Sequence, residues 1–173
     1  DLDALLDLGA LLATGARFAG AGTPRIGVVT TSGGSGILAA DAIADRGLLL
    51  AELDPQTVAD LTAIVPSYGN ATNPVDVTAA VMAEPGLFER CVDRLADDPN
   101  VDAIVACFAV LVGDDVLRIA NALGQVRSRT GLPVVAARTG ASWLAPQAAQ
   151  LLAEAGVAVM PTPERAVQAL AGL

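Results

Sequence analysis

A short run of serine and glycine residues offers the clearest chance of chemistry in this chain of 173 residues. It lies between a β-branched segment and a segment with helical spacing, and it consists of Ser32, Gly33, Gly34, Ser35 and Gly36. Glycines allow a tight turn and leave amide groups exposed at the start of a helix, where an anion is stabilised. The run therefore predicts an anion site, against the alternative of a plain turn with Ser35 as the N-cap.

The same run also partly matches the dinucleotide-binding fingerprint, as Gly34-x-Gly36-x-x-Ala39. Glu52 or Asp54 stands near the position of the acid that binds the ribose, although Asp54 also suits the N-cap of a helix. The closely spaced glycines begin one position later in the sequence than in the usual arrangement of this fingerprint. Rossmann-like binding of a dinucleotide therefore stays an alternative to the anion site.

Polar residues that could support the site follow one predicted helix, at residues 55–65, and one predicted strand, at residues 133–137. Asn73 and Asp76 bracket a Pro-Val pair in a polar loop, where they either orient a ligand or satisfy their own turn backbone. Arg138 follows a later strand, where a guanidinium holds a phosphate or carboxylate through two hydrogen bonds or is simply solvated. These three residues are predicted as supporting residues of the site.

The chain contains no histidine, and all ten of its basic residues are arginine. It therefore supplies no imidazole base, phosphohistidine or Walker-type lysine of its own. The lack of lysine also excludes a response-regulator receiver, which needs one at its fifth strand. Cys91 and Cys107 have no metal-site spacing, which predicts reduced core thiols and no metal site.

Composition excludes several classes of protein. The net charge is −9 and the sequence pI is near 4.2, so phosphate-rich nucleic acids and anionic lipid surfaces are poor partners. No apolar run reaches about 18 residues and no signal-peptide pattern opens the chain. At 53% hydrophobic and 17% charged residues, the chain is typical of a globular domain, which we expect to be cytoplasmic.

Apolar segments alternate with segments of helical spacing along the chain. Strands are predicted at residues 25–31, 48–50, 101–108, 133–137 and 157–160. Helices are predicted at residues 37–46, 55–65, 87–96, 114–128 and 143–155, and after residue 162. The pattern predicts an α/β fold with a doubly wound, mostly parallel five-stranded sheet and helices on both faces, with ligands at the carboxyl ends of the strands.

The first 22 residues are predicted to be a helix and a connector, followed by one domain over residues 23–173. Leu2, Leu5, Leu6 and Leu12 recur along one face of that helix. The chain opens without a methionine, directly in the helical pattern. We therefore expect a fragment of a larger multidomain protein, with a processed or trimmed chain as the alternative.

A series of motifs resembles the NDP-forming acyl-CoA synthetases of the succinyl-CoA synthetase superfamily. The motifs follow in order along nearly the whole chain: residues 26–42 with the Ser-Gly-Gly-Ser-Gly run, Ala51-Glu-Leu53, Asn73-Pro-Val-Asp76, Asp98-Pro-Asn-Val-Asp102, Gly156-Val157 and Thr162-Pro-Glu-Arg165. The match is to the flavodoxin-like CoA-ligase domain that lacks the phosphohistidine.

The resemblance implies a division of labour. An ATP-grasp module uses ATP or GTP, with Mg²⁺, to phosphorylate a histidine on another domain, and acyl phosphate and CoA then react at the junction between that domain and one like this. A CoA-binding domain is a further partner. The isolated domain is then inactive and binds none of these molecules tightly. A non-catalytic module that senses a nucleotide or CoA, as in some protein acyltransferases, is the alternative.

By position, the resemblance places residues 32–36 and the stretch Phe108, Ala109 and Val110 at the shared site. Relatives often carry glycines or polar residues in the second stretch, whereas this chain has apolar ones. The difference leads us to expect a bulky or aromatic acyl group rather than acetate or succinate.

Overall fold

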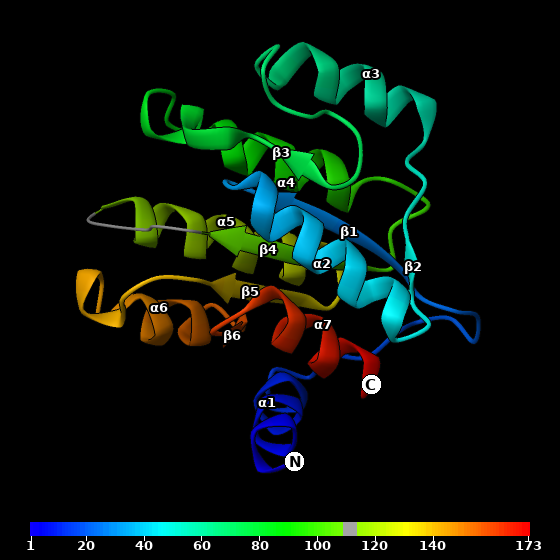
Figure 1. Cartoon of the computed structure of the whole chain (residues 1–173), viewed down its shortest axis with the longest axis vertical. Helices are drawn as coiled ribbons and strands as arrows, with labels where there is room; N and C mark the ends of the chain where they lie inside the picture. The colour runs from blue at the N-terminus through cyan, green and yellow to red at the C-terminus, as the bar shows by residue number, and fades with distance from the viewer. Residues whose placement is uncertain (109–113) are drawn as a thin grey trace.

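The computed structural model describes residues 1–108 and 114–173 (Figure 1). The strands of the described part are β1 (Arg25–Thr30), β2 (Leu49–Leu50), β3 (Val75–Asp76), β4 (Ala103–Phe108), β5 (Val134–Arg138) and β6 (Ala158–Met160). The α-helices are α1 (Leu2–Ala13), α2 (Gly33–Asp45), α3 (Pro55–Ile64), α4 (Leu87–Ala96), α5 (Asp114–Thr130), α6 (Ala148–Glu154) and α7 (Pro163–Ala171). Short 3₁₀ turns cover Thr78–Met82 and Ser142–Leu144.

The strands form one parallel sheet in the order β2-β1-β4-β5-β6, and β3 also pairs with β1. Without β3 this is the flavodoxin-like order, so the predicted doubly wound α/β fold is confirmed. β4 lies at the centre and is buried along its whole length. Such a strand needs apolar side chains on both faces, which is why its sequence is a continuous apolar run.

Helices cover both faces of the sheet. Figure 1 shows α2 and α7 in front of it and α4 and α5 behind it. One core cluster joins the sheet to α3, α4, α5 and α6, and the other joins it to α1, α2 and α7. Because parallel strands are connected through these helices, every helix that follows a strand starts near the carboxyl edge of the sheet.

The β2–β3 region differs from the sequence-based expectation. Val75 and Asp76 were expected in a loop, but they pair with Val29 and Thr30 of β1. The reason is the shortness of β2, which pairs only with the first half of β1 and leaves the second half available. Two short strands thus share one edge of β1.

Two helix boundaries also differ from expectation. α2 begins at Gly33 with Ser32 as its N-cap, earlier than the predicted start at residue 37, and the alternative of a turn with Ser35 as the N-cap was wrong. The helix predicted over residues 143–155 is divided into a 3₁₀ turn and α6, with Pro146 between them. Proline lacks the amide hydrogen that a continuous helix would use.

Candidate functional site

The serine–glycine run forms the first turn of α2, directly after the carboxyl end of β1. The hydroxyl of Thr30 fixes the junction, because it accepts a hydrogen bond from the Ser32 amide at 3.0 Å and donates one to the Ser32 carbonyl at 2.8 Å. The Ser32 side chain does not cap the helix. In the described part of the chain, the amides of residues 33–35 form no hydrogen bond, as expected for the first turn of a helix. They are available as donors to an anion.

A small pocket of about 210 Å³ adjoins this turn. Gly33 and Ile37 of α2 line one side, and Asn70, Pro74 and Asp76 line the other. A Cβ atom at Gly33 would lie 3.1 Å from Oδ2 of Asp76, so a larger residue at position 33 would press against this carboxylate. The site thus combines amide donors from α2 with a carboxylate acceptor from β3.

Asp76 is held in place by its neighbours. It pairs with Thr30 across the sheet, and its Oδ1 accepts a hydrogen bond from the Thr78 amide at 2.8 Å. Thr78 has a φ of 57°, an unusual value for a β-branched residue. The carboxylate therefore stands at the carboxyl edge of the sheet, a position that comes from the pairing of β3 with β1. Asn70, which the sequence reasoning missed, braces the loop by donating to the carbonyl of Pro74 at 2.9 Å.

Asn73 has a different task from the predicted one. Its Oδ1 accepts from the Val28 amide at 2.8 Å, and its Nδ2 donates to the carbonyls of Ile26 at 2.8 Å and Ala51 at 3.0 Å. The side chain thereby fills the gap between β2 and β3 on the edge of β1. Asn73 satisfies backbone groups of the sheet rather than those of its own turn.

Phe108 ends β4 with its side chain in the core. Its ring packs against that of Phe88, with centroids 4.8 Å apart, and both residues are fully buried. Its carbonyl accepts from the amide and hydroxyl of Thr139. Ala109 and Val110 lie outside the described residues.

Arg138 ends β5 at the same edge of the sheet, and its Nη2 donates to the carbonyl of Ala141 at 3.4 Å. Ala137 belongs to the core on the α2 side, and side chains alternate along a strand, so Arg138 faces the α4–α6 side. Arg138 is thus not gathered with the first turn of α2.

An ionic cluster near the first turns of α4 and α5 had no sequence signal, because its members come from separate helices. Arg118 pairs with Glu89 through Nε and with Asp115 through Nη1. Within the described part of the chain, Oε2 of Glu89 and Nη2 of Arg118 are buried without a hydrogen-bond partner. We interpret the cluster as a structural link between α4 and α5.

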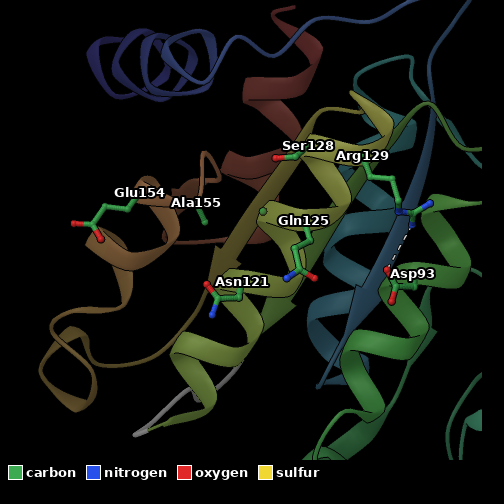
Figure 2. A pocket seen from close by; sticks show the side chains of 8 residues that line it. Asp93, Asn121, Gln125, Ser128, Arg129, Glu154 and Ala155 are labelled. Atoms are coloured by element: carbon green, nitrogen blue, oxygen red, sulfur yellow. Dashed lines mark ion pairs between the residues drawn. The ribbon is translucent and has the colours of Figure 1, made fainter.

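A larger surface groove lies elsewhere, on the helices behind the sheet (Figure 2). It has a volume of about 840 Å³, and Asn121, Gln125 and Arg129 project into it from α5. Asp93 of α4 pairs with Arg129 at 3.5 Å, and Glu154 stands at the end of α6. Its polar residues lie on the face of the sheet opposite α2, so it does not contribute to the pocket beside Asp76.

Metal-binding clusters and membrane-spanning helices are both absent from the described residues. In residues 1–108 and 114–173, no three histidine, cysteine or acidic side chains gather closely enough to hold a metal ion. Over the same residues, no helix is long and apolar enough to span a membrane.

Two known proteins are similar to this chain in sequence. The alpha subunit of an ADP-forming acetate–CoA ligase II from Pyrococcus furiosus is 33% identical over 144 residues, which cover 81% of this chain and 31% of that protein. The alpha subunit of acetate–CoA ligase I from the same organism is 28% identical over 148 residues, covering 84% of this chain and 31% of that protein. The chain thus spans about a third of the length of these relatives.

Solved structures show the same fold. The crystal structure of PH0766 from Pyrococcus horikoshii OT3 superposes with a TM-score of 0.85 at 26% identity, covering the whole of this chain and 39% of that one. A dinucleotide-forming acetyl-coenzyme A synthetase 1 from Ca. Korarchaeum cryptofilum superposes with a TM-score of 0.82 at 23% identity, covering 99% of this chain and 36% of that one.

A family model described as the Ligase-CoA domain matches residues 26–172. In the described part of the chain, this range includes all helices after α1 and all strands, apart from the first residue of β1. The chain belongs to the Ligase-CoA domain family.

Proposed function

We propose that this chain is the ligase module of a cytoplasmic acyl-CoA synthetase that joins a carboxylic acid to CoA while a nucleoside triphosphate is cleaved to the diphosphate and phosphate. The first turn of α2 would hold the phosphoryl group at the junction with the other modules. The observation that carries the proposal is the set of amides at residues 33–35, which no described residue pairs with, at the carboxyl edge of the sheet. Family membership and the acetate–CoA ligase relatives support it.

The chemistry divides between this chain and its partners. Because the chain has no histidine, the phosphorylated imidazole must come from another module. This chain would supply backbone donors and the walls of the pocket, and the ATP-grasp module would handle the magnesium nucleotide. Ser32 would add a hydroxyl, since it does not cap α2.

The acyl group is proposed to be bulkier than acetate. Ile37 and Pro74 form an apolar wall beside the amide donors of α2. A trans-feruloyl-CoA synthase is 33% identical over 82 residues, covering 47% of this chain. Turnover of a panel of acids by the complete synthetase tests this point, and activity with acetate or succinate alone would refute it.

The test of the site uses two variants at Gly34 in the complete synthetase. A side chain there has room, because the nearest atom to a Cβ is Oγ of Ser32 at 3.9 Å. Gly34→Asp places a negative charge where the phosphoryl group is proposed to bind, and Gly34→Asn has nearly the same shape without the charge. We expect Gly34→Asp to lower acyl-CoA formation by about 100-fold or more, and Gly34→Asn by less than about tenfold.

Stability separates this effect from misfolding. An acid in the first turn of a helix is stabilising, so Gly34→Asp should unfold at the same temperature as Gly34→Asn or higher. Equal activity of the two variants would show that no anion binds there. If γ-labelled ATP never labels the wild-type synthetase, the regulatory module becomes the better assignment. The 173-residue chain alone should form no acyl-CoA in the same assay.

A further inference from the structure

The carboxylate of Asp76 shares a pocket with the first turn of α2, where the anion site is proposed. Its Oδ2 lies 3.1 Å from the place of a Cβ atom at Gly33, and both residues line the pocket of about 210 Å³. Oδ1 accepts from the Thr78 amide, whereas Oδ2 accepts no hydrogen bond from a residue in the described part of the chain. Because like charges repel, Asp76 works against a site for anions in general.

In the described part of the chain, no positive side chain pairs with this carboxylate. None of the ion pairs there includes Asp76, and none of the described side chains that line the pocket is basic. The side-chain donors of the lining are already used. The hydroxyl of Thr30 donates to the Ser32 carbonyl, and Nδ2 of Asn70 donates to two backbone carbonyls of its own loop. The free groups are therefore the amides of the turn, as donors, and Oδ2 of Asp76, as acceptor.

Ser35 gives a second, independent sign of a ligand at this turn. It is only 8% exposed, and its hydroxyl forms no hydrogen bond with a described residue. Buried hydroxyl groups normally have a partner. Among the described residues, only Glu89 and Arg118 have a fully enclosed side-chain polar atom that lacks a partner, so the Ser35 hydroxyl is not sealed off from a small molecule.

We propose that Asp76 makes this site selective for an oxyanion that carries a proton, and that its ligand is inorganic phosphate. The amides of the turn donate to the unprotonated oxygens of phosphate, and Oδ2 of Asp76 accepts from the protonated one. A charge-assisted hydrogen bond of this kind turns repulsion into attraction. Sulfate has the same shape but no proton at neutral pH, so its oxygens meet the carboxylate without a hydrogen bond.

The inference rests on the proposed function, which gives the proton a source. When the thiol of CoA attacks an acyl phosphate, a C–S bond forms, the C–O bond to the phosphate breaks, and the proton of the thiol leaves with the phosphate. Asp76 recognises the phosphate in this protonated state. The unprotonated phosphoryl group of the acyl phosphate lacks the hydrogen bond, so Asp76 favours the product over the intermediate.

Anion binding to the 173-residue chain, whose own helices cover both faces of its sheet, tests the inference. The probes are inorganic phosphate and sulfate at neutral pH and equal ionic strength, and the readout is the shift of the amide NMR signals of residues 33–35. We expect the wild type to bind phosphate more tightly than sulfate by about tenfold or more.

Asp76→Asn removes the charge and keeps the shape of the side chain, and its Oδ1 can still accept from the Thr78 amide. We expect sulfate to bind this variant more tightly, so that the preference for phosphate falls to about threefold or less. The matched control is Asp41→Asn, which removes an exposed charge further along α2. It should change the affinity for both anions alike and leave their ratio as in the wild type.

Equal binding of phosphate and sulfate by the wild type overturns the inference, and so does a preference for phosphate that Asp76→Asn retains. Signals of residues 33–35 that respond to neither anion also overturn it. The Gly34 variants of the complete synthetase decide separately about the proposed function. If Gly34→Asp and Gly34→Asn differ in activity as expected while the preference for phosphate is absent, the phosphoryl site stands and only the role of Asp76 is lost.

Discussion

Asn73 shows how much of the sheet depends on one side chain. Its side-chain amide forms hydrogen bonds with two backbone groups of β1 and with one backbone carbonyl of the segment after β2. In Asn73→Asp a carboxylate would face the carbonyls of Ile26 and Ala51. We expect the free energy of unfolding to fall by about 2–4 kcal/mol at pH 7, measured by urea denaturation.

The loss should shrink in acid, because the carboxyl group of the Asn73→Asp variant, once protonated, can again donate to one carbonyl. Asn70→Asp is a suitable comparison, since Asn70 braces an exposed loop. A loss below about 0.5 kcal/mol in Asn73→Asp would mean that water replaces the amide.

Asp102 gives the molecule a defined response to acid. It accepts hydrogen bonds from the backbone amide and Nε of Arg25, both at 2.9 Å, and these tie the start of β1 to the start of β4. The hydrogen bond from the Arg25 side chain is the main cause that lowers the pKa of Asp102. A lowered pKa means that the ionised form stabilises the fold above the ordinary aspartate value of about 3.9.

This contribution is lost as the pH falls through the lowered pKa. We therefore expect the melting temperature of Asp102→Asn to fall less between pH 5 and pH 2 than that of the wild type. Melting temperatures of both proteins, measured at intervals of about one pH unit, test this. Asp41→Asn is the control, since Asp41 is exposed and forms no ion pair with a described residue. Parallel melting curves for wild type and Asp102→Asn would contradict the assignment.

At the scale of elements, α5 and α6 approach each other at a glycine. A Cβ atom at Gly124 would lie 2.9 Å from both Cβ and the carbonyl oxygen of Ala155, and neither atom can move without the backbone. Gly124→Ala should lower the free energy of unfolding by about 1–3 kcal/mol, because overpacking exceeds the gain in helix propensity.

Gly9 of α1 offers the matched comparison, since no described atom lies within 4 Å of a Cβ there. Gly9→Ala should raise the stability of α1 by about 0.5–1 kcal/mol. Urea denaturation of both variants at low concentration gives the two values. A free energy of unfolding higher in Gly124→Ala than in the wild type would show that α6 can move away from α5 without loss of stability.

The elements also show what the sequence could predict. Long apolar strands such as β4 and helices with clear starts, such as Asp54-Pro55 before α3, were predicted closely because pattern and capping agree. The first turn of α2 was expected as a loop, because glycine is a poor helix former. β3 was missed because two residues carry no periodicity. Its strand conformation depends on the edge left open by β2.

The candidate site divided in the same way. The position of the serine–glycine run at the carboxyl edge of the sheet follows from chain order alone, whereas that of Asp76 depends on β3, which was not predicted. The carboxylate beside Gly33 and the role of Asn73 in the sheet depend on contacts between distant segments, which one sequence does not display. The outward leucine face of α1 was equally hidden. Periodicity identifies an apolar stripe but not the direction in which it points.

At the scale of the whole molecule, the two cysteines report on global unfolding. Burial raises the pKa of Cys91 to about 12, and the pKa of Cys107 to about 12 as well. Both thiols lie in the core, one on each side of the sheet. At pH 8 we therefore expect iodoacetamide to modify neither in the native protein, and to modify both in concentrated urea at a rate that follows the unfolded fraction.

Peptide mapping distinguishes the two positions. Faster labelling of Cys91 than of Cys107 at low urea concentration would show that α4 unfolds locally before the sheet does. Equal rates would show that the molecule unfolds as one unit.

The amide of Asn73 also bears on how safely the protein can be concentrated. An uncovered strand edge is a template on which other chains add, and it is a common origin of fibres. β1 would be such an edge if β2 and β3 left a gap, but the Asn73 side chain closes the gap with hydrogen bonds of its own. The Asn73 side chain thus completes the cover that β2 and β3 give to this edge of β1, so that the strand is not open there to another chain.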